Sequence, residues 1–117
     1  MNKCNLLGLN KIVTLNLQLK VIWQKQFLGL AVDQVNKTIT LPITAYYFWP
    51  RTDAWKQLKL ELESKPWINP TETVKVLNLA TDVIASWQKE HTQEISPSMK
   101  EKLAQASFSS YMNYQDL

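Results

Sequence analysis

Apolar and polar residues alternate along the first third of the chain. From residue 13 to residue 23 every second position is apolar, and most positions between are polar. This period of two predicts a half-buried β-strand. The pattern returns over Leu28–Val32 and over Ile39–Ile43, with a short turn expected at residues 36–37. Pro42 cannot donate to a ladder, so the third strand is expected to lie at a sheet edge or to break at this residue. Together these segments predict a three-stranded antiparallel meander.

From about residue 53 the spacing of apolar residues becomes that of amphipathic helices. One helix is expected from Asp53, its N-cap, to Pro66, and a second from Asn69-Pro70 to about residue 90. A third, shorter helix starts at Ser96-Pro97. The predicted buried stripes are Ala54, Trp55, Leu58 and Leu62, then Val74, Leu77, Ala80, Ile84 and Trp87, then Met99, Leu103 and Ala106.

Strands followed by helices predict the α+β fold class, with two long helices and one short helix packed on the apolar face of the meander. The chain of 117 residues is expected to form a single domain, 1–117. Its ordered core should span about residues 11–107. Residues 108–117 show no clear period and are expected to form a tail.

Composition narrows the function classes. The single cysteine, Cys4, excludes an internal disulfide and a multi-cysteine zinc site. No stretch approaches the ~20 apolar residues of a membrane helix, so no membrane partner is expected. The formal net charge is +3, and residues 1–37 hold five lysines against one aspartate. This basic part of the chain is the better candidate for contact with phosphate.

Catalytic chemistry is not indicated. The only histidine, His91, stands near the end of the second helix, where a cation would favourably meet the last carbonyls. With two glycines in the chain there is no phosphate-binding loop, which argues against a nucleotide enzyme. A metal site normally recruits several ligands, and the chain has one histidine and one cysteine. No cofactor, metal or small-molecule substrate is expected. Asp33 is expected to end a strand. Asp53 is expected to cap a helix, the alternatives being a pair with Arg51 or a role in binding.

The five tryptophans allow two interpretations. Trp23, Trp55 and Trp87 lie on apolar stripes and are expected in the core. Trp49 and Trp67 each adjoin a proline, and core packing is the favoured interpretation for both. If exposed, they would stack on an unpaired base, anchor a protein or bind a small ligand such as a sugar or nucleotide.

The polar face of the predicted sheet is a second candidate surface. Gly29 and Ala31 would form its floor. Amides, hydroxyls and a lysine on such a face suit contact with ribose and phosphate. The favoured interpretation is an ordinary solvated sheet face. The lining residues are Asn16, Gln18, Lys20, Thr38 and Thr40.

Several segments are specific enough to recognise. The main ones are Tyr46–Trp55, which contains the letters FWPRTDAW, and Leu62–Ile68, which reads LESKPWI. They resemble the plastid-specific ribosomal protein 3 family of the small (30S) subunit, found in chloroplasts and cyanobacteria. The resemblance covers roughly residues 12–90, and Thr52 departs from it where the family more often has a charged residue. Further matching segments are Trp23, Gly29–Gln34, Leu41–Thr44, Leu77-Asn78, Ala80-Thr81 and Ile84–Trp87.

The resemblance implies a non-enzymatic structural component of the chloroplast small ribosomal subunit, located in the plastid stroma. Its expected partners are 16S rRNA and other small-subunit ribosomal proteins, and it is not expected to form homo-oligomers. The alternative is a substoichiometric regulatory or protein-interaction factor that visits the ribosome. Charge and placement select the binding candidates, of which the family motif directly supports only Arg51. They are Lys20, Lys25, Lys37, Trp49, Arg51, Lys56, Lys59 and Trp67.

Overall fold

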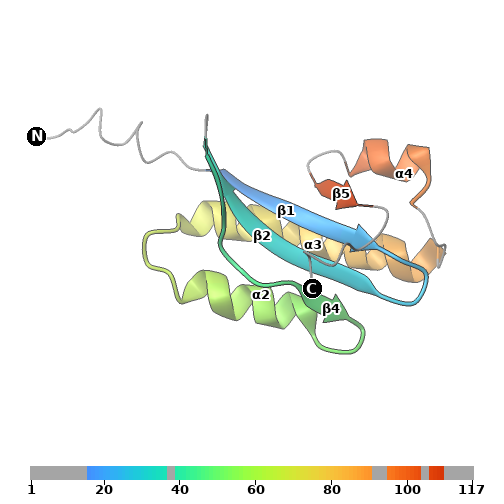
Figure 1. The fold of residues 1–117 in the computed structure, drawn as a ribbon, viewed down its shortest axis with the longest axis horizontal. Helices are drawn as coiled ribbons and strands as arrows, with labels where there is room; N and C mark the ends of the chain where they lie inside the picture. The colour runs from blue at the N-terminus through green and yellow to red at the C-terminus, as the bar shows by residue number, and fades with distance from the viewer. Residues whose placement is uncertain (1–15, 37–38, 91–94, 104–105, 110–117) are drawn as a thin grey trace, which may run out of the picture.

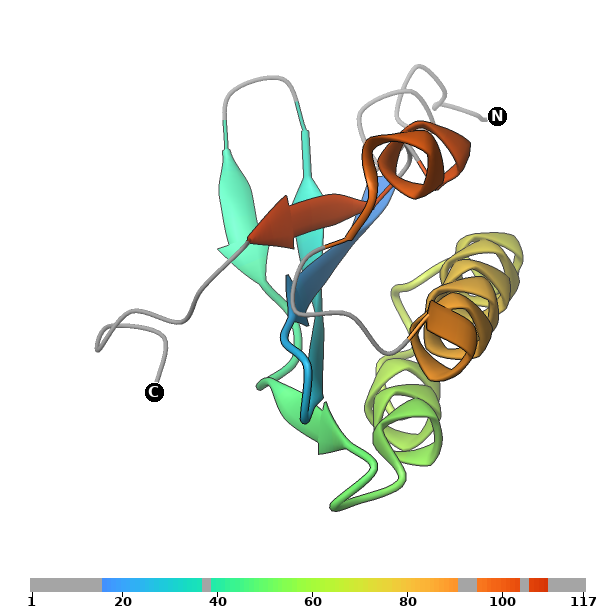
Figure 2. The ribbon, with the colours of Figure 1, turned by 90° about the vertical axis from the view of Figure 1, so that its right-hand side faces the viewer.

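A mixed β-sheet with two long helices on one face makes up most of the fold (Figure 1). The computed structural model describes residues 16–36, 39–90, 95–103 and 106–109. Figure 2 shows the helices α2 and α3 together on one side of the sheet. In chain order the elements are β1 (Asn16–Trp23), β2 (Leu28–Val35), β3 (Thr40–Pro42), β4 (Tyr47–Trp49), α2 (Ala54–Glu63), α3 (Pro70–Glu90), α4 (Pro97–Lys102) and β5 (Ser107–Ser109).

The long hairpin of β1 and β2 organises the sheet. The two strands pair antiparallel from Asn16 opposite Val35 to Trp23 opposite Leu28. β3 and β4 both pair antiparallel with the free edge of β2, at its end and its beginning respectively. β5 pairs with the other edge of β1, in parallel. The strand order is therefore β3-β2-β1-β5. β4 occupies the same edge of β2 as β3, at the opposite end of β2.

The predicted α+β class is confirmed, but the three-stranded antiparallel meander is not. The described sheet has five strands and is mixed, because β4 and β5 extend it and β5 is parallel to β1. Each of these two strands has three residues, too few to show a period of two in the sequence. β5 includes the first two residues of the predicted tail, and Phe108 packs near Trp23, with 6.4 Å between the ring centroids.

The core lies between the sheet and the two long helices. Most inward side chains of β1 and β2 are buried, Leu17 being half-buried, and they pack against the buried stripes of α2 and α3. Trp23 and Trp87 belong to this core, as predicted. The indole N–H of Trp87 donates to the carbonyl oxygen of Gln24, 2.6 Å away, and so ties α3 to the β1–β2 turn. Trp55 is half-buried and donates to the carbonyl oxygen of Leu77 in α3, at 3.1 Å.

Two apolar expectations are wrong in detail. Ile39 and Leu41 are 51% and 49% exposed, because β3 is an edge strand and α2 packs on β2 and β4 instead. Val74 is 56% exposed because the buried stripe of α3 begins at Thr73 and continues through Val76, which turns Val74 outward.

All three predicted helix starts are confirmed by capping contacts. The carboxylate of Asp53 accepts a hydrogen bond from the backbone N–H of Lys56 at 3.0 Å. The hydroxyl of Ser96 accepts one from the backbone N–H of Met99 at 3.2 Å. The side-chain oxygen of Asn69 accepts from the N–H of the second residue of α3 at 2.8 Å. Such contacts satisfy backbone donors that have no partner within the helix.

Candidate nucleic-acid interface

The face of the sheet opposite α2 and α3, here the outer face, carries the lysine predicted for it. Directly paired residues share a face, and the register places Lys20 beside Ala31 and Gln18 beside Asp33. Gln18 and Lys20 therefore lie on this face, whereas Thr38 is outside the described residues. Ala31 is only 2% exposed, so the small-residue floor is covered instead of open to solvent.

Lys20 already has partners on this face. Its Nζ lies 3.6 Å from Oδ2 of Asp33 and 5.1 Å from the centre of the Tyr46 ring. The sequence analysis expected Asp33 to end a strand. This expectation is wrong, because β2 continues to Val35. The buried Asp33 carboxylate fixes the lysine above the sheet, where about a third of the lysine side chain stays exposed. The lysine can thus meet solvent or a ligand while remaining paired.

Three aromatic side chains that the sequence analysis did not select lie on the same face. Phe48 is paired with Gly29, and the Phe27 ring meets the Phe48 ring edge to face at 5.6 Å between centroids. The Tyr46 ring lies at 6.3 Å from the Phe48 ring, with only 21° between their planes. We call Phe27, Phe48 and Tyr46 the aromatic row. Its signal in the sequence was the spacing of Tyr46 and Phe48, two residues apart and therefore on one face of a strand.

The other predicted cations are spread over one end and one side of the molecule. Lys25 is exposed in the β1–β2 turn, and Arg51 is exposed in the turn between β4 and α2. On α2, Lys56 is exposed, while Lys59 is half-buried and pairs with Glu63 at 3.4 Å. Lys37 lies outside the described residues. The described cations are therefore not gathered into one patch.

The structure separates Trp49 from Trp67. Trp49 precedes α2 and Trp67 follows it, so the helix lies between them. Trp49 is half-buried against the core, and its buried indole nitrogen has no hydrogen-bond partner among the described residues. Trp67 is 65% exposed. Of the two, Trp67 has the exposed ring that a partner needs for stacking or anchoring.

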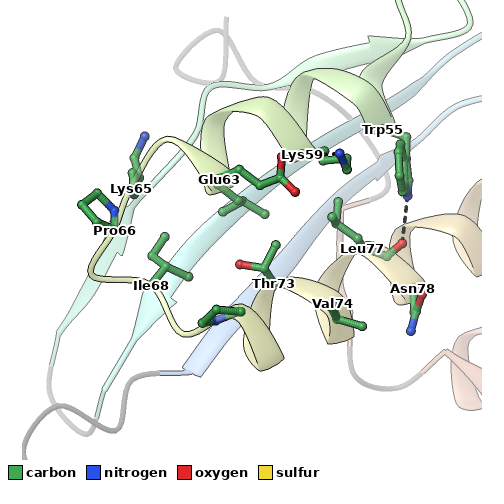
Figure 3. Close-up of a pocket in the computed structure, with 12 residues that line it drawn as sticks. Trp55, Lys59, Glu63, Lys65, Pro66, Ile68, Thr73, Val74, Leu77 and Asn78 are labelled. Atoms are coloured by element: carbon green, nitrogen blue, oxygen red, sulfur yellow. Dashed lines mark hydrogen bonds and ion pairs between the residues drawn. The ribbon is translucent and has the colours of Figure 1, made fainter.

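A groove of about 530 Å³ runs between α2 and α3 (Figure 3). Trp55 and Leu77 stand at one end of it, joined by the hydrogen bond from the indole. Lys65 and Pro66, from the loop before α3, stand at the other end. The groove is mainly apolar between the two helices. Its other lining residues are Lys59, Leu62, Glu63, Ile68, Pro70, Thr73, Val74 and Asn78.

Among the described residues, Tyr47 is the titratable group whose pKa is strongly shifted, and its side chain serves the fold. The Tyr47 hydroxyl donates to Oε2 of Glu61, which joins β4 to α2. This hydrogen bond, with burial and the glutamate charge, raises the pKa of Tyr47 to about 12. The phenol stays neutral at physiological pH and has no role as a base. Within the described part of the chain, no group of three or more His, Cys, Asp or Glu is placed to hold a metal ion. His91 and Cys4 lie outside that part.

No described helix has the length and apolar character needed to cross a membrane.

Comparison with known proteins identifies the family. The family described as "Plastid and cyanobacterial ribosomal protein (PSRP-3 / Ycf65)" matches residues 43–90, which include β4, α2 and all of α3. The chain is 42% identical over 89 residues to the small ribosomal subunit protein cS23 of Gracilaria tenuistipitata var. liui, covering 76% of this chain and 90% of that protein. The chain belongs to this family.

Other PSRP-3 / Ycf65 relatives agree. The small ribosomal subunit protein cS23 of Mesostigma viride is 48% identical over 90 residues, which cover 77% of this chain and 69% of the relative. A probable small ribosomal subunit protein cS23 from Synechococcus sp. (strain JA-2-3B'a(2-13)) is 51% identical over 70 residues, or 60% of this chain and 71% of the relative. The resemblance stated from the sequence is thereby confirmed.

The PSRP-3 / Ycf65 match separates the candidate residues into two groups. Trp49, Arg51 and Trp67 fall inside residues 43–90, as do the two lysines of α2. Lys20 and Lys25 precede the matched segment. Tyr46 and Phe48 fall inside it, so the family segment supplies two of the three rings of the aromatic row.

Proposed function

We propose that this chain is a structural component of the small ribosomal subunit of a plastid, where it binds 16S rRNA and neighbouring ribosomal proteins in support of translation. The observation that carries this proposal is the identity of 42–51% to proteins named small ribosomal subunit protein cS23. The chain acts by binding and is not an enzyme. It works in the stroma, as one copy within the subunit and not as a homo-oligomer.

Binding to rRNA rests on lysine and arginine contacts with phosphate. Exposed cations release counterions from the RNA when they neutralise phosphates, which favours association at low salt. Lys25, Arg51 and Lys56 are exposed and suit this role directly. Lys20 and Lys59 bind phosphate only by sharing or exchanging their carboxylate partners. Lys37 completes the proposed set.

Contacts with neighbouring proteins use the loop between α2 and α3. Trp67 presents an aromatic side chain that is 65% exposed, and exposed tryptophans commonly anchor protein interfaces. Trp49 acts from within, since it packs at the start of the β4–α2 turn and holds that turn against the core. The two tryptophans therefore have different roles, one in contact and one in shape.

The proposal is tested by sedimenting ribosomes of the host through a high-salt gradient, with quantitative mass spectrometry of each fraction. A structural component should appear in the small-subunit peak at one copy per subunit. Recovery in trace amounts on the subunit, or at the top of the gradient, would instead favour a substoichiometric regulatory factor.

A further inference from the structure

The outer face of the sheet is built around a close approach between Phe48 and Gly29. A Cβ atom placed on Gly29 would lie 2.9 Å from Cε1 of Phe48 and 3.3 Å from Cβ of Ile22. Only glycine leaves room for the ring at this distance, because real Cβ contacts are longer. The absence of a side chain at position 29 thus lets the Phe48 ring lie down on the sheet.

The other two rings extend this contact along the face. The Phe27 ring, from the β1–β2 turn, contacts the Phe48 ring edge to face. The Tyr46 ring also neighbours the Phe48 ring, and the Lys20 ammonium lies above the Tyr46 ring. Ile22, beneath the rings, is 0% exposed. All three residues of the aromatic row are half-buried, so each keeps part of its surface exposed to solvent. The result is an aromatic surface with a cation in contact, on a face that neither α2 nor α3 covers (Figure 2).

Cations lie near both ends of the aromatic row, although the described cations as a whole form no single patch. Trp49 pairs with Leu28, so the turn that carries Arg51 lies beside the turn that carries Lys25. Lys20 supplies the third cation, on the face itself. Among the described residues of this face, the only acid is Asp33, which is buried and paired with Lys20. The charge around the rings therefore complements a polyanion.

We propose that the aromatic row binds unpaired bases of ribosomal RNA by stacking, while Lys20, Lys25 and Arg51 contact the flanking phosphates. The inference rests on the proposed function and adds the site and the class of RNA. Sequence-tolerant stacking on aromatic rings beside cations is the usual means of holding single-stranded RNA. A duplex keeps its base faces inside the stack and offers no equivalent contact. A protein partner would not require cations at both ends of the row.

The first test measures binding of the purified full chain to a fluorescein-labelled single-stranded RNA oligomer and to a hairpin duplex of the same length. The double variant Tyr46→Leu/Phe48→Leu keeps apolar side chains over the sheet but removes two rings. We expect it to bind the single strand at least ~10-fold more weakly, because it loses the stacking contacts of two rings. The control is Phe108→Leu, which removes a half-buried ring from the opposite face of the sheet and should leave RNA affinity unchanged. Circular dichroism verifies that both variants are folded.

The second test is ultraviolet crosslinking of small subunits that carry the wild-type or the double-variant protein. We expect an RNA crosslink on the peptide that contains Tyr46 and Phe48, and its loss in a variant that still sediments with the subunit. An RNA crosslink only elsewhere, a protein crosslink at this peptide, or unchanged oligomer affinity would overturn the inference and leave the proposed function standing. Absence of the wild-type protein from the small-subunit peak would overturn both.

Discussion

The Tyr47 hydroxyl donates to the Glu61 carboxylate and so joins a three-residue strand to the helix that follows it. Tyr47 lies on the face of β4 that points toward the helices, whereas Phe48 lies on the outer face of the sheet. β4 is thus fixed by α2 on one face and contributes to the aromatic row on the other. The short strand gains from this contact a stability that its own few ladder hydrogen bonds do not supply.

Removing the Tyr47 hydroxyl should therefore destabilise the fold. Tyr47→Phe leaves the Glu61 carboxylate without this donor, and we expect a loss of about 1–3 kcal/mol, as for hydrogen bonds to charged groups. The pKa of Tyr47 is raised to about 12 in the folded chain from an ordinary value of 10.0. Its contribution is therefore complete below pH 10 and disappears as the pH rises from 10 through 12. Denaturant titrations of wild type and variant at pH 7, 10 and 12 check this: the difference should shrink only above pH 10. A constant difference would show that the hydroxyl does not titrate as stated.

A methyl group at position 29 should disturb the aromatic row more than the core. In Gly29→Ala the new Cβ would force the Phe48 ring to tilt away from the sheet. The Phe48 ring is half-buried and lies outside the buried core, so we expect a cost of about 1 kcal/mol, at the low end for overpacking. Affinity for single-stranded RNA should fall as in the double ring variant. Thermal unfolding and the oligomer assay measure the two effects separately. Unchanged RNA affinity would show that the position of the Phe48 ring is unimportant for binding.

Neutralising exposed cations should lower the salt dependence of RNA binding. For Arg51→Gln combined with Lys56→Gln, the slope of log affinity against log salt should decrease by about 1 for each phosphate that the protein no longer neutralises. The matched control is Lys100→Gln, an exposed lysine on α4 outside the proposed interface. Binding measured at several salt concentrations gives the slope. If the double variant and the control have the same slope as wild type, the phosphates are bound by other residues.

Substitutions at two tryptophans should distinguish a residue that contacts a partner protein from one that packs in the core. Trp67→Ala removes a ring that is 65% exposed, so we expect a stability change within about 0.5 kcal/mol and weaker retention on the subunit at high salt. Trp23→Ala empties a fully buried site and should cost about 3–5 kcal/mol. Urea unfolding and sedimentation provide the two readouts. Full retention of Trp67→Ala would remove this residue from the proposed protein interface.

The sequence predicts the parts of this fold that repeat or that act locally. The alternation before Trp23 is long enough to define β1, and Asp53 and Ser96 cap helices through residues three positions away. The site depends on pairs that no local pattern links. Phe48 lies on Gly29, and Phe108 reaches Trp23, across intervals set only by the folded sheet. β4 and β5 have three residues each and, unlike β3, do not lie within a longer alternating segment, so these two strands and the aromatic row were not predicted.

The parallel pairing of β5 with β1 also sets an order in time. A ribosome makes β1 among the first of the described elements and β5 as the last. Until Ser107 to Ser109 leave the ribosome, the β1 edge that will receive them has unpaired N–H and C=O groups, which are a template for association with other chains. The β1–β2 hairpin and α2 can pack earlier, because their partners are close in the chain. The nascent chain therefore exposes this edge of β1 until β5, the last of the described strands, has been made.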